Sequence, residues 1–174
     1  MADLTFEVEA RWSGSGSSAS GSLETGGQVM SWSVPASMGG RGEGSSPEEL
    51  LASAVATCYT ATLSALLTRD RLPWSQLQVG MEETVADYPG ARARIARLLV
   101  KPEVVGGDSR RVVEYQRTAE QARDHCFIGH HLSAEIGYEV AAVRMGADAS
   151  GDGGGGPGSV GARLGGHEGS GKNP

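Results

Sequence analysis

A long uncharged run in the middle of the chain most constrains the fold. The stretch SSPEELLASAVATCYTATLSALL begins with a helix-start signal: Ser46 is a suitable N-cap, Pro47 takes the first helical position, and Glu49 follows three residues after the cap. No residue from Leu50 to Leu67 is charged, and apolar or small residues occur all round the expected helix. We therefore predict a central core helix that is covered on both faces.

The length of this run also fits a membrane span, for which about 18 uncharged residues is the lower limit. Against a span, the run has no interfacial aromatic girdle, and segments with strand character lie on both sides of it. It also contains five hydroxyl residues, namely Ser53, Thr57, Thr60, Thr62 and Ser64. We expect burial within protein and no contact with a membrane.

Strand patterns surround the central helix. Residues 4–12 alternate apolar and mostly polar side chains, QVMSWSVP at 28–35 does the same, and the Ser/Gly stretch between them reads as a loop or a loosely formed hairpin. Residues 77–87 and 93–105 form two further strands, joined through the turn signal DYPGA into an antiparallel hairpin. Residues 134–143 contain a closing strand.

A second helix follows GGDS. Its apolar stripe consists of Val112, Tyr115, Ala119 and Ala122, and this stripe extends to Cys126. The order strand, strand, helix, strand, strand, helix, strand predicts an α+β domain over residues 1–145. Residues 146–174 are a Gly-rich tail without an apolar pattern, which we expect to be disordered.

Composition excludes several classes of protein. A chain of 174 residues with 39% hydrophobic residues suits a single domain. The net charge of -6 argues against nucleic-acid binding, which needs clustered Lys and Arg. Two cysteines are too few for a disulfide scaffold, and the first residues lack the pattern of a signal peptide, so we expect a cytoplasmic protein.

The two thiols are the candidates for chemistry. Cys58, in the central helix, is either an inert core residue or a reactive thiol, and Cys126 follows the second helix. A reactive cysteine needs a nearby positive charge, because an unperturbed thiol of pKa about 8.5 is mostly protonated at pH 7. The helix dipole acts only within the first turn, which leaves Arg41 or Arg11 as the activating group.

A carboxylate would orient such an arginine, and the candidates nearest in sequence are Glu48 and Glu49. Glu48 precedes Cys58 by ten positions, or roughly 15 Å along a helix axis. Glu48 is therefore either a favourable acid at a helix N-terminus, or part of a site that a spanning arginine or a second copy of the chain completes.

Three histidines near Cys126 raise a metal-binding alternative. His125, His130 and His131 flank this cysteine, but their spacing matches none of the regular zinc patterns. Neither a metal nor a cofactor is therefore expected.

The stretch SSPEELLASAVATCYT resembles the family of osmotically inducible protein C (OsmC) and the organic hydroperoxide resistance protein (Ohr), over about residues 5–142. Members carry Asn-Pro-Glu-(Glu/Gln)-Leu, a run of small residues and a cysteine, with the same interval between glutamate and cysteine. A second cysteine after a charged helix, here AEQARDHC, also corresponds. Where the best-known members have Pro-Val-Ser after that cysteine, this chain has FIGHH, so that Phe127 replaces the proline.

The resemblance implies an OsmC-like fold, in which antiparallel sheets wrap long central helices in an intertwined homodimer. It also implies a thiol-dependent peroxidase that acts in oxidative-stress defence and reduces organic hydroperoxides. Cys58 would be the attacking thiolate and Cys126 the resolving thiol, with Arg41 and Glu48 as the activating pair and Arg11 as the reserve. A lipoyl-bearing protein or a small thiol would be the reductant. The alternatives are a non-catalytic dimeric binding protein of the same fold and a Cys/His metal-binding protein.

Overall fold

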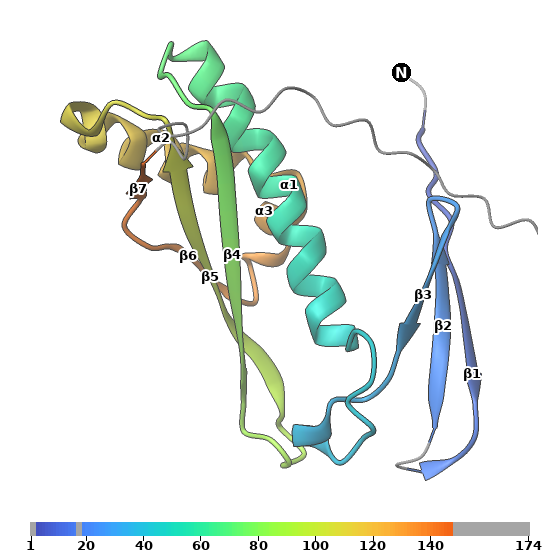
Figure 1. The fold of residues 1–174 in the computed structure, drawn as a ribbon. Coiled ribbons are helices and arrows are strands. Elements are labelled where there is room, and N and C mark those ends of the chain that lie inside the picture. Colours follow the sequence, from blue (N-terminus) through green and yellow to red (C-terminus); the bar gives the residue numbers. More distant parts are fainter. Residues whose placement is uncertain (1–2, 17–18, 148–174) are drawn as a thin grey trace, which may run out of the picture.

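The structure is a computed structural model that describes residues 3–16 and 19–147. Its elements in chain order are β1 (Glu9–Ser13), β2 (Ser20–Thr25), β3 (Gln28–Trp32), the 3-10 turn η2 (Ala36–Met38), α1 (Pro47–Arg69), β4 (Gln76–Ala86), β5 (Arg94–Val105), the 3-10 turn η3 (Ser109–Arg111), α2 (Val112–His125), α3 (Phe127–Leu132), β6 (Gly137–Val140) and β7 (Arg144–Gly146). The predicted α+β class is confirmed (Figure 1).

The central helix α1 begins where the sequence predicts. The Ser46 hydroxyl accepts a hydrogen bond from the Glu49 amide at 3.1 Å, and the Ser46 amide donates to Glu49 Oε2 at 2.8 Å. This reciprocal capping box satisfies two amides that have no partner within the helix.

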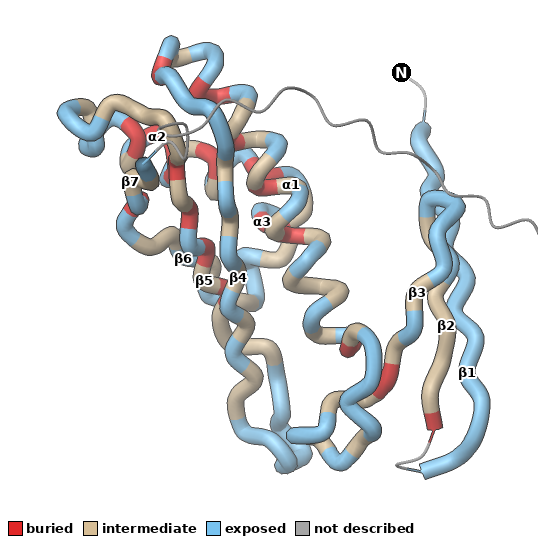
Figure 2. The backbone as a smooth tube through the Cα atoms, in the orientation of Figure 1, coloured by how far each residue is buried: buried red, intermediate tan, exposed pale blue. Residues whose placement is uncertain are grey.

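Within the chain, α1 is covered on one face only. Its buried side chains are Val55, Tyr59, Leu63, Leu66 and Leu67, which recur at helical spacing. The exposed positions include small or hydroxyl-bearing residues, namely Ser53, Thr57, Ala61, Ala65 and Thr68. The expectation that both faces are covered is therefore not met by this chain alone (Figure 2).

The buried face of α1 packs against a four-stranded sheet and the other two helices. β4 and β5 form the predicted antiparallel hairpin, whereas β6 and β7 run parallel to β5 and pair with different parts of it. This sheet is thus mixed rather than purely antiparallel, because α2 and α3 carry the chain back before β6 begins. Val100 and Val104 of β5 join residues of α1 and α2 in the core.

The second sheet consists of β1, β2 and β3 and stands apart from the rest of the chain, on the opposite side of α1 from β4 and β5 (Figure 1). The Ser/Gly-rich stretch predicted as a loop or a loose hairpin connects β1 to β2, which pair antiparallel, and it includes the first residues of β2. Gly21 in this strand is required, because a Cβ there would lie 2.5 Å from Nε1 of Trp32. Trp32 packs in turn against Trp12, with ring centroids 4.6 Å apart.

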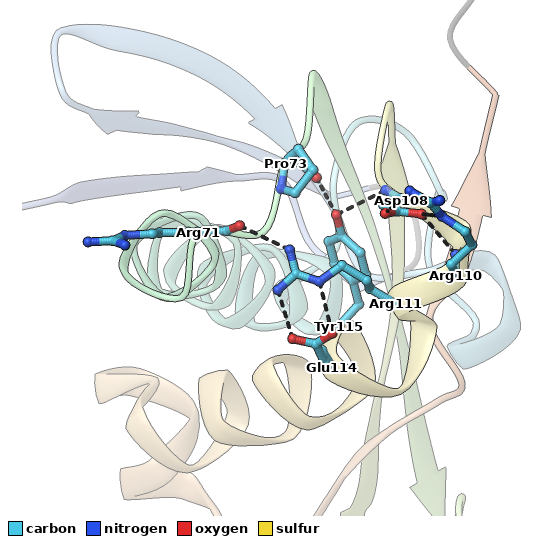
Figure 3. A network of polar contacts seen from close by, with 7 residues as sticks. All are labelled: Arg71, Pro73, Asp108, Arg110, Arg111, Glu114 and Tyr115. Atoms are coloured by element: carbon cyan, nitrogen blue, oxygen red, sulfur yellow. Dashed lines mark hydrogen bonds and ion pairs between the residues drawn. The ribbon is translucent and has the colours of Figure 1, made fainter.

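A polar network ties the end of α1 to the start of α2 (Figure 3). The Tyr115 hydroxyl donates to the carbonyl of Pro73 and accepts from the amide of Asp108 at 3.1 Å. Arg111 donates to the carbonyl of Arg71 at 3.2 Å. These bonds join two loops that are distant in sequence and fix α2 against α1.

Several predicted details differ from the structure. Val112 is 40% exposed, so the buried stripe of α2 begins at Tyr115. Helix α3 and strand β7 were not predicted, and Gly146, the first residue of the predicted tail, pairs with Val105 in β7. The rest of that tail beyond Ala147 lies outside the described residues. On length and composition alone, α1 could cross a membrane, a property it shares with many helices at the core of a domain.

Candidate active site

The fold brings the two thiols together although 67 residues separate them in the chain. Cys58 lies half-buried on α1, and Cys126 is fully buried at the point where α2 ends and α3 begins. The Cys126 sulfur lies 4.0 Å from the carbonyl oxygen of Val55, about one turn before Cys58 on α1. Both cysteines are free, so the site is a dithiol in its reduced form.

The surroundings of Cys126 act on its pKa in opposite directions. Burial raises the pKa of this thiol most, and the neighbouring Cys58 raises it further. The backbone amide of Gly129 and the hydroxyl of Tyr138 lower it, because both can donate to a thiolate. Cys126 is thus a protonated, buried thiol at rest, with hydrogen-bond donors directed at it.

A second cluster lies at the N-terminal end of α1. A pocket of about 260 Å³ has apolar walls, including Met38, Met81 and Val85, and also contains Glu48 and Glu83. Glu48 Oε2 and both carboxylate oxygens of Glu83 are buried, with no hydrogen-bond partner among the described residues. Burial and the nearby Glu48 raise the pKa of Glu83.

The arginines predicted for the site lie elsewhere in the chain. Arg41, in the loop before α1, forms an ion pair with Glu43 at 2.7 Å. Arg11, on β1, pairs with Glu9 at 2.8 Å. Among the described residues, no ion pair joins either arginine to Glu48. The structure therefore brings Cys58 and Cys126 together, and the ion pairs described for Arg41 and Arg11 are with other carboxylates than Glu48.

The predicted carboxylates separate into two roles. Both glutamates line the pocket, but Glu49 Oε2 is engaged in the capping box, whereas Glu48 Oε2 has no hydrogen-bond partner among the described residues. Glu83 was missed, although the alternation in GMEETVA places it on the same side of β4 as Met81 and Val85. A carboxylate on the apolar side of a strand is the signal that could have identified it.

The apolar residues around Cys58 belong to the core. Val55, Tyr59 and Leu63 are buried, so within one copy of the chain they are not accessible to a substrate. Tyr138 lies in the predicted closing strand, and the sequence analysis assigns it no role at the thiols. Its hydroxyl is buried beside Cys126, without a hydrogen bond to any described residue.

The histidines near Cys126 lie on the outer side of the α2–α3 junction. His125 and His131 are exposed, and their Nδ1 atoms contact the carbonyls of Gln121 and Phe127 at 2.8 and 2.7 Å. His130 is exposed as well. Over residues 3–16 and 19–147, no group of three or more His, Cys, Asp or Glu side chains is arranged to hold a metal ion.

Comparison with known proteins identifies relatives of this architecture. A family model described as OsmC-like protein matches residues 40–141. The uncharacterized protein YmaD of Bacillus subtilis is 30% identical over 152 residues, which cover 85% of this chain and all of that protein.

Solved structures share the fold at low sequence identity. An organic hydroperoxide resistance protein OsmC from Legionella pneumophila superimposes with a TM-score of 0.65 at 15% identity, over 82% of this chain and 99% of that one. An organic hydroperoxide resistance protein from Elizabethkingia anophelis gives 0.62 at 14% identity, over 84% and 100%. An OsmC-like protein from Mycoplasma pneumoniae gives 0.64 at 12% identity, over 83% and 99%.

Proposed function

Because the chain belongs to the OsmC-like protein family, we propose that it is a thiol-dependent peroxidase that reduces organic hydroperoxides. The observation that carries this proposal is the dithiol, in which half-buried Cys58 stands beside buried Cys126. Solved structures with the same fold are named organic hydroperoxide resistance proteins, which supports the class of substrate.

In the proposed cycle, the Cys58 thiolate attacks one oxygen of the peroxide and the O–O bond breaks. The other oxygen leaves with the organic group and takes a proton to become an alcohol, while Cys58 becomes a sulfenic acid. Cys126 then attacks the Cys58 sulfur, water leaves, and a disulfide closes. An external dithiol, either a lipoyl-bearing protein or a small thiol, reduces this disulfide by exchange and is itself oxidised.

The thiolate of Cys58 needs a cation, and the carboxylates in the pocket at the start of α1 support the proposal that one is held there. Three buried carboxylate oxygens of Glu48 and Glu83 have no partner among the described residues, and a buried, unpaired charge is costly. A guanidinium could satisfy both carboxylates and extend toward Cys58. In this proposal Arg41 of a second copy supplies it, with Arg11 as the reserve.

A second copy of the chain would also cover the surfaces left open in one copy. The exposed face of α1 carries small residues, and Thr57 and Thr68 donate their hydroxyl groups to helix carbonyls at 2.9 Å, so these hydroxyl groups do not need water. Apolar side chains near the three-stranded sheet are exposed, including Phe6 at 89% and Val29 at 67%. We propose a homodimer in which these surfaces meet.

The test of this function is the consumption of tert-butyl hydroperoxide with dihydrolipoamide as the reductant. The native chain should turn over repeatedly, and Cys58→Ser should consume none. Cys126→Ser should form the Cys58 sulfenic acid with one equivalent of peroxide in the absence of reductant, and it should form no disulfide within the chain. An absence of turnover in the native chain would refute the peroxidase and favour the non-catalytic binding protein.

A further inference from the structure

Tyr138 is partly buried, and its buried hydroxyl differs from those of the buried residues Tyr59 and Tyr115. Tyr59 donates to the carbonyl of Ala119 at 3.0 Å, and Tyr115 donates to the carbonyl of Pro73. Among the described residues the Tyr138 hydroxyl has no such partner. Buried polar groups are nearly always hydrogen-bonded, so an exception needs an explanation, and one explanation is a partner that appears only when the site changes state.

The backbone of Gly129 determines where this hydroxyl lies. A Cβ at residue 129 would be 2.5 Å from Cε1, 2.6 Å from Cζ and 2.7 Å from the hydroxyl oxygen of Tyr138. The ring therefore rests directly on the backbone of α3, three residues after Cys126. Only glycine leaves room for the ring there, and this packing holds the hydroxyl beside the sulfur.

The sulfur of Cys126 has different partners in its two protonation states. As a thiol it can donate only weakly, to the Val55 carbonyl at 4.0 Å. As a thiolate it can accept from the Gly129 amide and from the Tyr138 hydroxyl. The other titratable groups near it are Cys58 and Tyr59 on α1, while Arg123 and Glu120 of α2 act on Tyr59.

We propose that Tyr138 is a positioning residue for the resolving thiol, and that its hydroxyl donates a hydrogen bond to Cys126 whenever that sulfur is a thiolate. The inference rests on the proposed peroxidase cycle and identifies the group that assists its second step. The unpartnered hydroxyl is the resting state of this donor, because a protonated thiol is a weak acceptor.

Two steps of the cycle use this bond. During closure, the Cys126 thiolate attacks the sulfenic sulfur of Cys58, an S–S bond forms, and hydroxide leaves and is protonated to water. During reduction, the external thiolate attacks the half-buried Cys58 sulfur, the S–S bond breaks, and the electron pair stays on Cys126, where Tyr138 stabilises it. The second thiol of the reductant then releases Cys58 from the mixed disulfide.

A single-turnover experiment tests the role of Tyr138. The reduced native chain, Tyr138→Phe and the control Tyr115→Phe each receive one equivalent of tert-butyl hydroperoxide, and dimedone trapping with mass spectrometry follows the sulfenic acid and the disulfide. Tyr138→Phe should form the sulfenic acid at the native rate and close the disulfide about threefold more slowly. Raising the pKa of Cys126 by about one unit lowers its thiolate fraction about tenfold, but the more basic thiolate is about threefold more nucleophilic. Closure at the native rate would overturn the proposal.

The control separates chemistry from stability. Tyr115→Phe removes a hydroxyl that makes two hydrogen bonds away from the thiols, so it should lower the melting temperature and leave closure unchanged. Tyr138→Phe keeps the ring on Gly129 and removes an unpartnered hydroxyl, so its melting temperature should change less than that of Tyr115→Phe. A Tyr115→Phe variant that closed as slowly as Tyr138→Phe would assign the effect to general destabilisation and refute the proposal.

A second measurement does not depend on peroxidase activity. Because the chain has two cysteines, Cys58→Ser leaves Cys126 as the single thiol, and its thiolate absorbance at 240 nm can be titrated. Adding Tyr138→Phe to this variant should raise the pKa of Cys126 by about one unit. An unchanged pKa would overturn the role of Tyr138, whereas absent peroxide chemistry in the native chain would refute only the proposed function.

Discussion

Replacing Gly129 with alanine should destabilise this protein, although the same change within most helices is stabilising. The new Cβ would lie 2.5 to 2.7 Å from three atoms of the Tyr138 ring and hydroxyl. Carbon atoms in good contact are about 3.5–4.0 Å apart, so the ring would have to move by about 1 Å. Such overpacking costs about 1–3 kcal/mol.

A smaller effect opposes this cost. Alanine is more favourable than glycine inside a helix by about 1 kcal/mol. The net change for Gly129→Ala is therefore a loss of up to about 2 kcal/mol in the free energy of unfolding. Moving the Tyr138 hydroxyl away from Cys126 should also slow disulfide closure, as is expected for Tyr138→Phe.

A double-mutant cycle isolates the contact between Gly129 and Tyr138. Tyr138→Val keeps a residue suited to strand β6 and removes every ring atom that the new Cβ would meet. In that background Gly129→Ala should stabilise the protein by up to about 1 kcal/mol, so the sign of its effect reverses. The coupling energy between the two positions should be about 1–3 kcal/mol.

Urea unfolding followed by circular dichroism measures these values. All four proteins must be compared at one protein concentration, because the stability of a dimer depends on concentration. Equal stabilisation by Gly129→Ala in both backgrounds would show that the ring does not rest on the backbone of α3. That result would also remove the geometric basis for the role of Tyr138.

Three further predictions concern the ends of α1. Ser46→Ala removes the capping box and should lower the free energy of unfolding, measured by urea unfolding, by about 1 kcal/mol. An unchanged free energy of unfolding would mean that the cap contributes nothing. Glu48→Gln should slow the oxidation of Cys58 by peroxide at least about tenfold. The control Glu49→Gln still fits the capping box and should react at the native rate. Equal rates for both variants would refute a role for Glu48. Arg69 donates hydrogen bonds that hold the pKa of Asp70 below its ordinary value, and a threonine on α2 contributes to a smaller extent. The stabilising effect of these bonds is therefore present above about pH 4 and is lost as the pH falls through the lowered pKa. The urea midpoint should therefore fall more on acidification for the native chain than for Asp70→Asn, and parallel curves would contradict this.

The cysteines show how far family resemblance and local pattern reach. The interval between Glu48 and Cys58 and the position of Cys126 after a charged helix are features of sequence, and the structure does bring both thiols to one place. Helix α3 nevertheless begins directly after Cys126 with Phe127 where the best-known relatives have proline. Proline favours the start of a new helix at this position, but the start of α3 does not require it.

Local interactions explain what the sequence by itself determined. Three features depend on residues a few positions apart and can therefore be predicted from the sequence. They are the start of α1, the β4–β5 hairpin and the polar face of α2. Strand β2 shows the opposite case. Its Ser/Gly composition predicts a loop or a loose hairpin, and its place in the middle of a three-stranded sheet depends on pairing with β1 and β3.

Contacts between distant residues were decided only by the tertiary structure. The shared pocket of Glu48 and Glu83, the approach of Cys126 to Val55 and the packing of Tyr138 on Gly129 join separate elements. Periodicity indicates which side of an element is buried but not which residues it meets, because that depends on how α1, β4, β6 and α3 pack in three dimensions. The sequence therefore identified the thiols, and the packing of these elements determined which groups surround them.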